Sequence, residues 1–191
     1  MNQSNILIFA SGSGSNAEVI IRHFATHQKI HVVAVFTNNP QAGVFARAEK
    51  LNIPCFVFSN EDFLDGQTLN QKLKNINCSH IVLAGFLRKI PELLIQNFKI
   101  VNIHPALLPN YGGRGMYGMK VHEAVLAAGE NESGITIHEV NQKYDEGTIL
   151  FQAKCKVKAD DTPNTIAERI HKLEHKHFPE QIEKWILQND N

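Results

Sequence analysis

Short apolar runs alternate with amphipathic segments through the first half of the chain. Runs rich in β-branched and aromatic residues occur at residues 6–9, 31–36, 55–58, 80–84 and 100–103. Runs that are apolar at successive positions are typical of strands buried on both faces of a parallel sheet. We therefore predict a strand at each of these places.

The segments between the strands have helical spacing. Val19, Ile20 and Phe24 fall on one face of a helix that Asn16 can cap at its N-terminus. Such strand–helix alternation indicates a parallel sheet covered by helices. The other predicted helices cover residues 42–51, 62–75 and 116–128, begin at Pro91, and run from Pro163 to near 188.

The pattern changes after Pro109. Residues 133–140 and 148–158 have the composition of strands, but the interval between them leaves no room for a crossover helix. They should pair antiparallel. The expected fold is therefore α/β, with three α/β/α layers and a mixed, mainly parallel sheet. A chain of 191 residues fits a single domain, residues 1–191.

Charge and cysteine content narrow the class of protein. Lys+Arg and Asp+Glu both total 19, so the formal net charge is zero, and neither nucleic acid nor an anionic membrane is an expected partner. Met1 to Asn5 carries no basic targeting segment, and no apolar run approaches the roughly 18 residues that span a bilayer. Three widely spaced cysteines, Cys55, Cys78 and Cys155, fit a reducing cytoplasm.

A glycine-rich turn follows the first strand. Gly12-x-Gly14-x-x-Ala17 formally matches a dinucleotide fingerprint, but the second strand ends at Thr37 with no acidic residue nearby for a ribose. Backbone N–H groups at the start of a helix bind an anion without basic side chains. A phosphate monoester site is favoured over a purely structural turn, and a dinucleotide site is the least favoured of the three.

Asn102 and His104 stand where another apolar strand gives way to a loop. Residues two apart on a strand project to the same side, and ligands of open α/β sheets bind at the carboxyl ends of strands. An amide donor beside an imidazole can stabilise an oxyanion and handle a proton. A lone histidine is more often structural, so this pair needs further support.

Three separated motifs support a catalytic role for Asn102 and His104. Residues 83–88 (LAGFLR), 102–109 (NIHPALLP) and 144–150 (YDEGTIL), together with the opening GSGSN at 12–16, resemble the folate-dependent formyltransferases, and most closely those that act on glycinamide ribonucleotide. The resemblance covers essentially the whole chain. It implies a Rossmann-like phosphate-binding half, residues 1–100, and a catalytic and folate-binding half, residues 101–191.

The resemblance also assigns residues. It implies a catalytic trio of Asn102, His104 and Asp145, and acceptor-binding residues that comprise the loop Gly14, Ser15, Asn16 and the helical residue Glu174. Folate-binding positions are implied at Leu87, Arg88, Lys89, Ile90, Asn102, Gln142 and Asp145. The implied cosubstrate is 10-formyltetrahydrofolate, the acceptor is glycinamide ribonucleotide, and no metal takes part. A monomer and a homodimer both fit the sequence.

The implied chemistry is attack of a neutral acceptor amine on the formyl carbon. Protonated His104 and the Asn102 amide would hold the developing oxyanion, and the Asp145 carboxylate would raise the histidine pKa. Two departures from the family stand out. Gly112 occupies a position that is often proline in the family, and no arginine lies between Arg47 and Arg88, where some members contact the folate tail.

Alternatives remain for the C-terminal helix and for the acceptor. His171, Glu174 and His175 match the H-x-x-E-H zinc pattern, but a third ligand is not evident downstream, so a helix face with Glu174 turned toward the acceptor is favoured. His122 is expected to be a surface or satisfied core residue. A formyltransferase for another amine, such as a nucleotide-linked amino sugar or initiator tRNA, is the second hypothesis. A dinucleotide-binding regulatory domain is the third, and it would leave the trio without a role.

Overall fold

The computed structural model describes residues 3–189, so Met1, Asn2 and the last two residues of the predicted domain lie outside it. One seven-stranded sheet has the order β3-β2-β1-β4-β5-β6-β7. Strands β1 to β5 run parallel, and β6 pairs antiparallel with both β5 and β7. The predicted mixed, mainly parallel sheet is confirmed. The strands are β1 (Ser4–Phe9), β2 (Ile30–Thr37), β3 (Cys55–Val57), β4 (His80–Leu83), β5 (Lys99–His104), β6 (Glu132–Glu139) and β7 (Ile149–Lys156).

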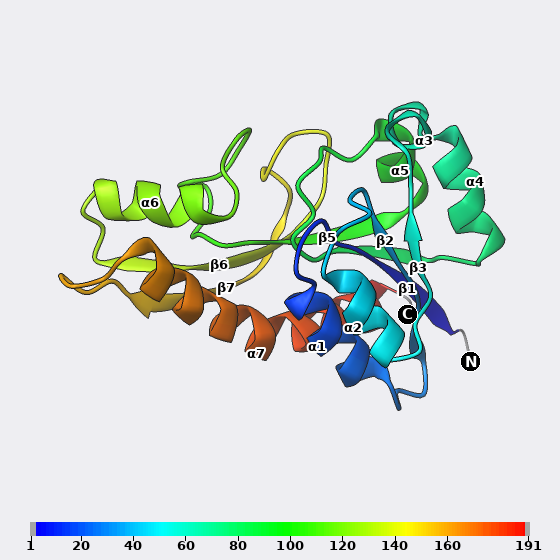
Figure 1. Ribbon diagram of the computed structural model, residues 1–191, viewed down its shortest axis with the longest axis horizontal. Coiled ribbons are helices and arrows are strands. Elements are labelled where there is room, and N and C mark those ends of the chain that lie inside the picture. Colours follow the sequence, from blue (N-terminus) through cyan, green and yellow to red (C-terminus); the bar gives the residue numbers. More distant parts are fainter. Residues whose placement is uncertain (1–2, 190–191) are drawn as a thin grey trace.

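Helices cover both faces of the sheet (Figure 1). Ile6 and Ile8 of β1 face one layer, formed by α1, α2 and α7, whereas Leu7 and Phe9 face the opposite layer of α3, α4 and α5. This alternation along one strand explains why its apolar run is continuous. The helices are α1 (Ser15–Phe24), α2 (Val44–Lys50), α3 (Asn60–Asp65), α4 (Gln67–Asn75), α5 (Glu92–Asn97), α6 (Met119–Ala127) and α7 (Pro163–Asn189).

Glycines change two of the predicted helices. The single helix expected over 62–75 is two helices, because Gly66 between them has φ 68°, a left-handed conformation that interrupts the helical hydrogen bonds. The helix expected from Met116 begins at Met119 instead, because Gly118 has φ 56° and ψ −137°. Both predicted boundaries were wrong because a glycine with positive φ interrupts the helix.

The cap of α1 also differs from the prediction. Gly14 occupies the N-cap position with φ 77°, and no side chain caps the helix. Asn16 lies inside the first turn, where its amide contacts Glu174 of α7. The first-turn N–H groups are therefore left without a side-chain cap, as an anion-binding helix start requires.

The carboxyl ends of β1, β4 and β5 meet at one edge of the sheet because these neighbouring strands are parallel. That edge carries the glycine-rich turn, the segment after Leu83, and Asn102 with His104. The antiparallel partner β6 brings His138 opposite Asn102. Among residues 3–189, no helix is long and apolar enough to cross a membrane.

Candidate active site

A cavity of about 620 Å³ opens at this edge of the sheet, a volume that suits a small-molecule site. It contains nearly every residue that the sequence implicated. These are Gly14, Ser15, Asn16, Leu87, Arg88, Lys89, Ile90, Asn102, His104, Asp145 and Glu174. Gln142 is the exception: it does not line the cavity, and its amide donates to Glu92 Oε1 at 2.7 Å.

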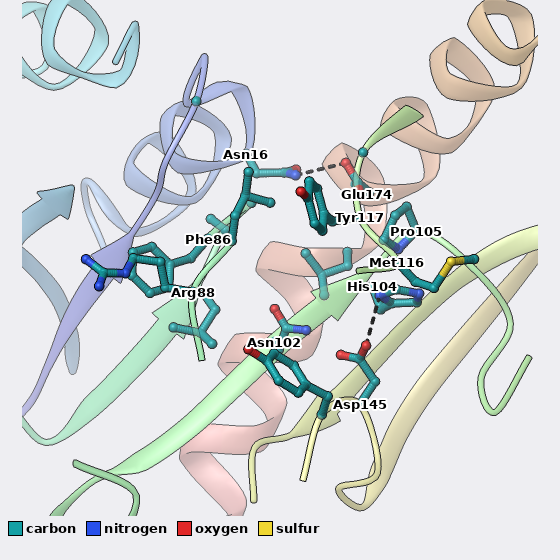
Figure 2. A pocket seen from close by; sticks show the side chains of 18 of the residues that line it. Asn16, Phe86, Arg88, Asn102, His104, Pro105, Met116, Tyr117, Asp145 and Glu174 are labelled. Atoms are coloured by element: carbon teal, nitrogen blue, oxygen red, sulfur yellow. Dashed lines mark hydrogen bonds and ion pairs between the residues drawn. The ribbon is translucent and has the colours of Figure 1, made fainter. Parts of the chain in front are cut away.

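His104 and Asp145 meet in the middle of the cavity wall (Figure 2). Nδ1 of His104 lies 3.7 Å from Asp145 Oδ2, and its Nε2 donates to the carbonyl oxygen of Tyr111 at 2.8 Å. The Gly113 N–H also donates to Asp145 Oδ2, at 2.8 Å. These contacts hold the imidazole and the carboxylate in fixed orientations, although the two residues are far apart in the sequence.

His138 orients the third member of the predicted trio. Its Nδ1 donates to the carbonyl oxygen of Glu139 at 2.8 Å, which leaves Nε2 of the neutral ring as an acceptor. Asn102 Nδ2 donates to that nitrogen at 3.0 Å. His138 Nε2 is also 3.6 Å from Asp145 Oδ1. One hydrogen of the Asn102 amide is thus engaged, and the second remains for a ligand.

Burial decides the charge state of His104. Burial lowers the pKa of His104 more than the nearby Asp145 carboxylate and the Tyr111 carbonyl raise it, so the net shift is downward. Asp145 thus raises the pKa of His104, as expected from the sequence, but burial outweighs this effect. Burial alone would raise the pKa of Asp145, but the neighbouring His138, the charge of His104 and the Gly113 N–H together lower it.

Asn16 and Glu174 form one end of the cavity (Figure 2). Asn16 Nδ2 and His171 Nδ1 each donate to Glu174 Oε2 at 2.9 Å. The hydrogen bond to the carboxylate raises the pKa of His171. Among the described residues, no side chain donates to Oε1 of Glu174, so this oxygen is available to a ligand. The carboxyl group is buried, which makes it a strong site for a positive or polar group.

The glycine-rich turn beside Asn16 carries no basic side chain. Arg47 lies near it, but its Nε donates to the Ser13 carbonyl at 2.9 Å and its guanidinium pairs with Glu18. An anion at this turn would therefore be held by backbone N–H groups and the dipole of α1.

The H-x-x-E-H match does not form a metal cluster in the structure. His171 turns its Nδ1 to Glu174, and within residues 3–189 no group of three His, Cys, Asp or Glu side chains is arranged to hold an ion.

The opposite end of the cavity is open and partly apolar. Leu87 and Tyr144 are exposed there, and Lys89 Nζ lies 5.8 Å from the Tyr144 ring centroid. Arg88 does not point freely into the cavity, because its guanidinium stacks 4.6 Å above Phe63 and donates to Asn60 Oδ1 at 2.6 Å. This end suits a flat, largely apolar ligand.

The cavity lining includes residues that the sequence did not assign to the site. Met116 and Tyr117 line it from the segment before α6, and His122 lines it from α6 itself. His122 is buried but makes no hydrogen bond with the described residues, so its prediction as a satisfied core or surface residue was wrong. The closely spaced glycines of 112–118 were the available signal, because such turns commonly bring a segment over a site.

Comparison with known proteins gives a consistent result. The family model described as formyl transferase matches residues 4–182. Phosphoribosylglycinamide formyltransferase of Bacillus subtilis is 36% identical, with 96% of this chain and 95% of that protein covered. The structure of phosphoribosylglycinamide formyltransferase from Anaplasma phagocytophilum matches with a TM-score of 0.87 at 32% identity, covering 98% of this chain and 89% of the other.

Plant relatives are longer. The chloroplastic phosphoribosylglycinamide formyltransferase of Arabidopsis thaliana is 40% identical over 94% of this chain, which spans 64% of that protein. The corresponding protein of Vigna unguiculata is 38% identical, and the chain spans 61% of its length.

Proposed function

The chain belongs to the formyl transferase family, and we propose that it transfers the formyl group of 10-formyltetrahydrofolate to the amine of glycinamide ribonucleotide in purine synthesis. The observation that carries this proposal is the position of the trio. Asn102, His104 and Asp145 lie in one cavity between an end suited to a phosphate and an end suited to a flat apolar ligand. Transfer of a group from one such ligand to the other requires the reacting residues to lie between the two binding sites.

At the acceptor end, the proposed phosphate site is the turn at Gly14 and the first N–H groups of α1, at Ser15 and Asn16. Backbone donors and the helix dipole supply the attraction. Glu174 offers its unpaired Oε1 to the glycinamide part of the acceptor, while Asn16 and His171 hold the other oxygen. The amine is thereby directed toward His104.

At the open end, Leu87 and Ile90 supply apolar surface for the folate ring system, and Tyr144 flanks the same space. The main chain of Arg88 and Lys89 follows the same wall, and Leu87 N is fixed by donation to Ser11 Oγ at 3.1 Å. The formyl donor is already activated by its attachment to nitrogen. Gln142 takes no part in this proposal, because it does not reach the cavity.

His104 carries the proton chemistry. Its neutral resting form accepts a proton as the acceptor nitrogen bonds to the formyl carbon, and the resulting imidazolium is stabilised by Asp145. The imidazolium and the remaining Asn102 N–H then hold the formyl oxygen, which has become negative. When the carbon–nitrogen bond to the folate breaks, that nitrogen takes the proton from the imidazolium, so His104 returns to its neutral form and one proton has moved from the acceptor to the folate.

The proposal extends to the cellular setting. We propose a single domain, residues 1–191, that acts in the cytoplasm as a monomer or homodimer on these two small molecules. Zero net charge and three dispersed cysteines support it.

The direct test is an assay of the purified chain with 10-formyltetrahydrofolate and glycinamide ribonucleotide, followed by folate absorbance. We expect formyl transfer to this acceptor and none to a nucleotide-linked amino sugar in a parallel reaction. Transfer to the amino sugar alone would replace the proposed acceptor, and no transfer to either would reject the function.

A further inference from the structure

His122 is a polar side chain in the cavity wall to which the mechanism above gives no role. It lies in the first turns of α6 and is only 3% exposed, yet it lines the cavity. Its Nδ1 is fully buried without a hydrogen-bond partner, and within residues 3–189 neither ring nitrogen makes a hydrogen bond. Buried polar groups are nearly always paired, so an unpaired one beside a cavity indicates a ligand.

The surroundings of His122 favour a single neutral tautomer. Burial lowers its pKa, and the neighbouring His171 lowers it further, so the ring is neutral near pH 7. A buried N–H without an acceptor is rarer than an unpaired lone pair. The proton therefore belongs on Nε2, because Nδ1 is fully buried and an N–H there would reach no acceptor. The ring then presents one N–H donor, and the cavity is where that donor can be used.

The position of His122 indicates which ligand it meets. The charges that act on it come from His171 and Glu174 at the acceptor end and from His104 at the reacting centre. Figure 2 shows the pair Asn16 and Glu174 apart from the pair His104 and Asp145, with an interval between the two pairs. The acceptor's phosphate would bind beside Asn16 of the first pair and its amine would react at the second pair. The part of the acceptor between its phosphate and its amine must therefore lie across this interval.

We propose that His122 is an acceptor-binding residue whose Nε2–H donates to an oxygen in the ribosyl-glycinamide part of the ribonucleotide, a ribose hydroxyl or the amide carbonyl. This inference rests on the proposed function and adds a contact that determines acceptor affinity. The contact gives the one N–H of the ring an acceptor, which no side chain or backbone group within residues 3–189 supplies, and Nδ1 keeps its buried lone pair.

The test uses three substitutions of His122. His122→Leu removes the donor and should raise KM for glycinamide ribonucleotide about 3- to 10-fold, the range expected for one hydrogen bond. KM for 10-formyltetrahydrofolate should stay unchanged. Because the substitution also removes an unpaired buried nitrogen, Tm should be unchanged or higher, whereas a purely structural histidine would give a lower Tm.

Two amides then locate the donor on the ring. The side-chain amide of His122→Gln reaches the position of Nε2 and should restore KM to within about twofold of wild type. The shorter His122→Asn places its amide near Nδ1, where no partner exists, and should not. Rescue by Asn instead of Gln would overturn the assignment of Nε2 as the donor.

His175→Leu is the matched control. His175 also has a buried, unpaired Nε2 and a pKa lowered by burial, but it lies outside the cavity lining. Its substitution should leave both KM values unchanged. If the wild-type protein is active and His122→Leu has the same KM for the ribonucleotide, the role of His122 is rejected while the proposed function stands. If wild type transfers no formyl group to the ribonucleotide, the proposed function fails.

Calorimetry with ribose 5-phosphate separates the two oxygens. Weaker binding of this probe to His122→Leu supports a ribose hydroxyl, because the probe has no amide. Unchanged binding of ribose 5-phosphate, with weaker binding of glycinamide ribonucleotide, supports the amide carbonyl. Unchanged binding of both ligands rejects the contact.

Discussion

The two ends of the cavity are built in different ways. At the acceptor end, Asn16 and Glu174 are 8% and 5% exposed and are joined by a 2.9 Å hydrogen bond between α1 and α7. At the opposite end, Leu87 and Tyr144 are 52% and 39% exposed and extend from loops. The first end is organised before any ligand arrives, whereas the second leaves apolar surface that only a ligand would cover.

This difference has an energetic meaning. Polar groups that recognise a small charged ligand must be held in place beforehand, since ordering them on binding would cost affinity. A large flat ligand is held mainly by apolar burial, which is non-directional and tolerates imprecise geometry. Substitutions that displace the organised turn at the acceptor end should therefore change both stability and binding, and substitutions at the open end should change binding alone.

The largest expected effect belongs to neither end. Asp145→Ala should lower kcat roughly 10²–10⁴-fold, because it removes the group that orients and stabilises His104 during proton transfer. KM for either substrate should change little, because the two ends remain intact. Steady-state kinetics measures kcat and both KM values of the variant, and circular dichroism checks that the variant is folded. A kcat within tenfold of wild type would remove Asp145 from the mechanism.

The pH profile sharpens this first prediction. The pKa of His104 is below its ordinary value of 6.5, and the proposed mechanism starts from the neutral imidazole. Activity should therefore fall with decreasing pH along an acid limb whose midpoint lies below pH 6.5. An acid limb centred above pH 6.5 would show that the pKa of His104 is raised, and activity that instead falls as the pH rises through that pKa would indicate that the reaction starts from the imidazolium.

The second prediction compares two glycines of the acceptor turn. At Gly14, φ is +77° and an added Cβ would lie 2.5 Å from Val44 Cγ2, while at Gly12 an added Cβ meets no atom within 4 Å. Gly14→Ala should cost about 2–4 kcal/mol in the free energy of unfolding. A displaced turn should also weaken ribonucleotide binding on the order of 100-fold.

Gly12→Ala is the control for that experiment. It should leave the free energy of unfolding within about 0.5 kcal/mol of wild type, as at an unconstrained surface position. Denaturant unfolding and calorimetry with each substrate measure both variants. If Gly14→Ala binds the ribonucleotide as wild type does, the turn is not the phosphate site, and the contrast between the two ends loses its main support.

The sequence predicted the sheet better than it predicted the site. The continuous apolar run at residues 6–9 specified a strand buried on both faces, and the short interval before 148 required an antiparallel pair. The trio and the ligand-binding residues followed from the family resemblance. Three-dimensional packing determines what local pattern does not contain: the contact of Asn16 with Glu174, 158 positions apart, and the burial that keeps His104 neutral.

Glu174→Gln tests the charge at the acceptor end. The substitution keeps the shape but removes the negative charge, so KM for the ribonucleotide should rise roughly tenfold, consistent with a charge-assisted hydrogen bond. The folate KM should be unchanged. Glu180→Gln, at an exposed position of the same helix, should have no effect on either constant. An equal rise in both KM values would show that Glu174 supports the fold of the cavity rather than the acceptor.

The smallest effect is expected at the open end. Leu87 is half exposed, so Leu87→Ala should leave the free energy of unfolding within about 0.5 kcal/mol of wild type. The folate would cover that exposed surface on binding, and its loss should raise the folate KM about fivefold, equivalent to about 1 kcal/mol of apolar burial. Leu64→Ala is the control, because Leu64 is also exposed but does not line the cavity. Destabilisation by Leu87→Ala, or an equal rise in the folate KM for both variants, would mean that the open end is organised in advance like the acceptor end. If Leu87→Ala leaves the free energy of unfolding unchanged and raises the folate KM, the acceptor end is organised by folding and the open end buries its apolar surface only when the folate binds.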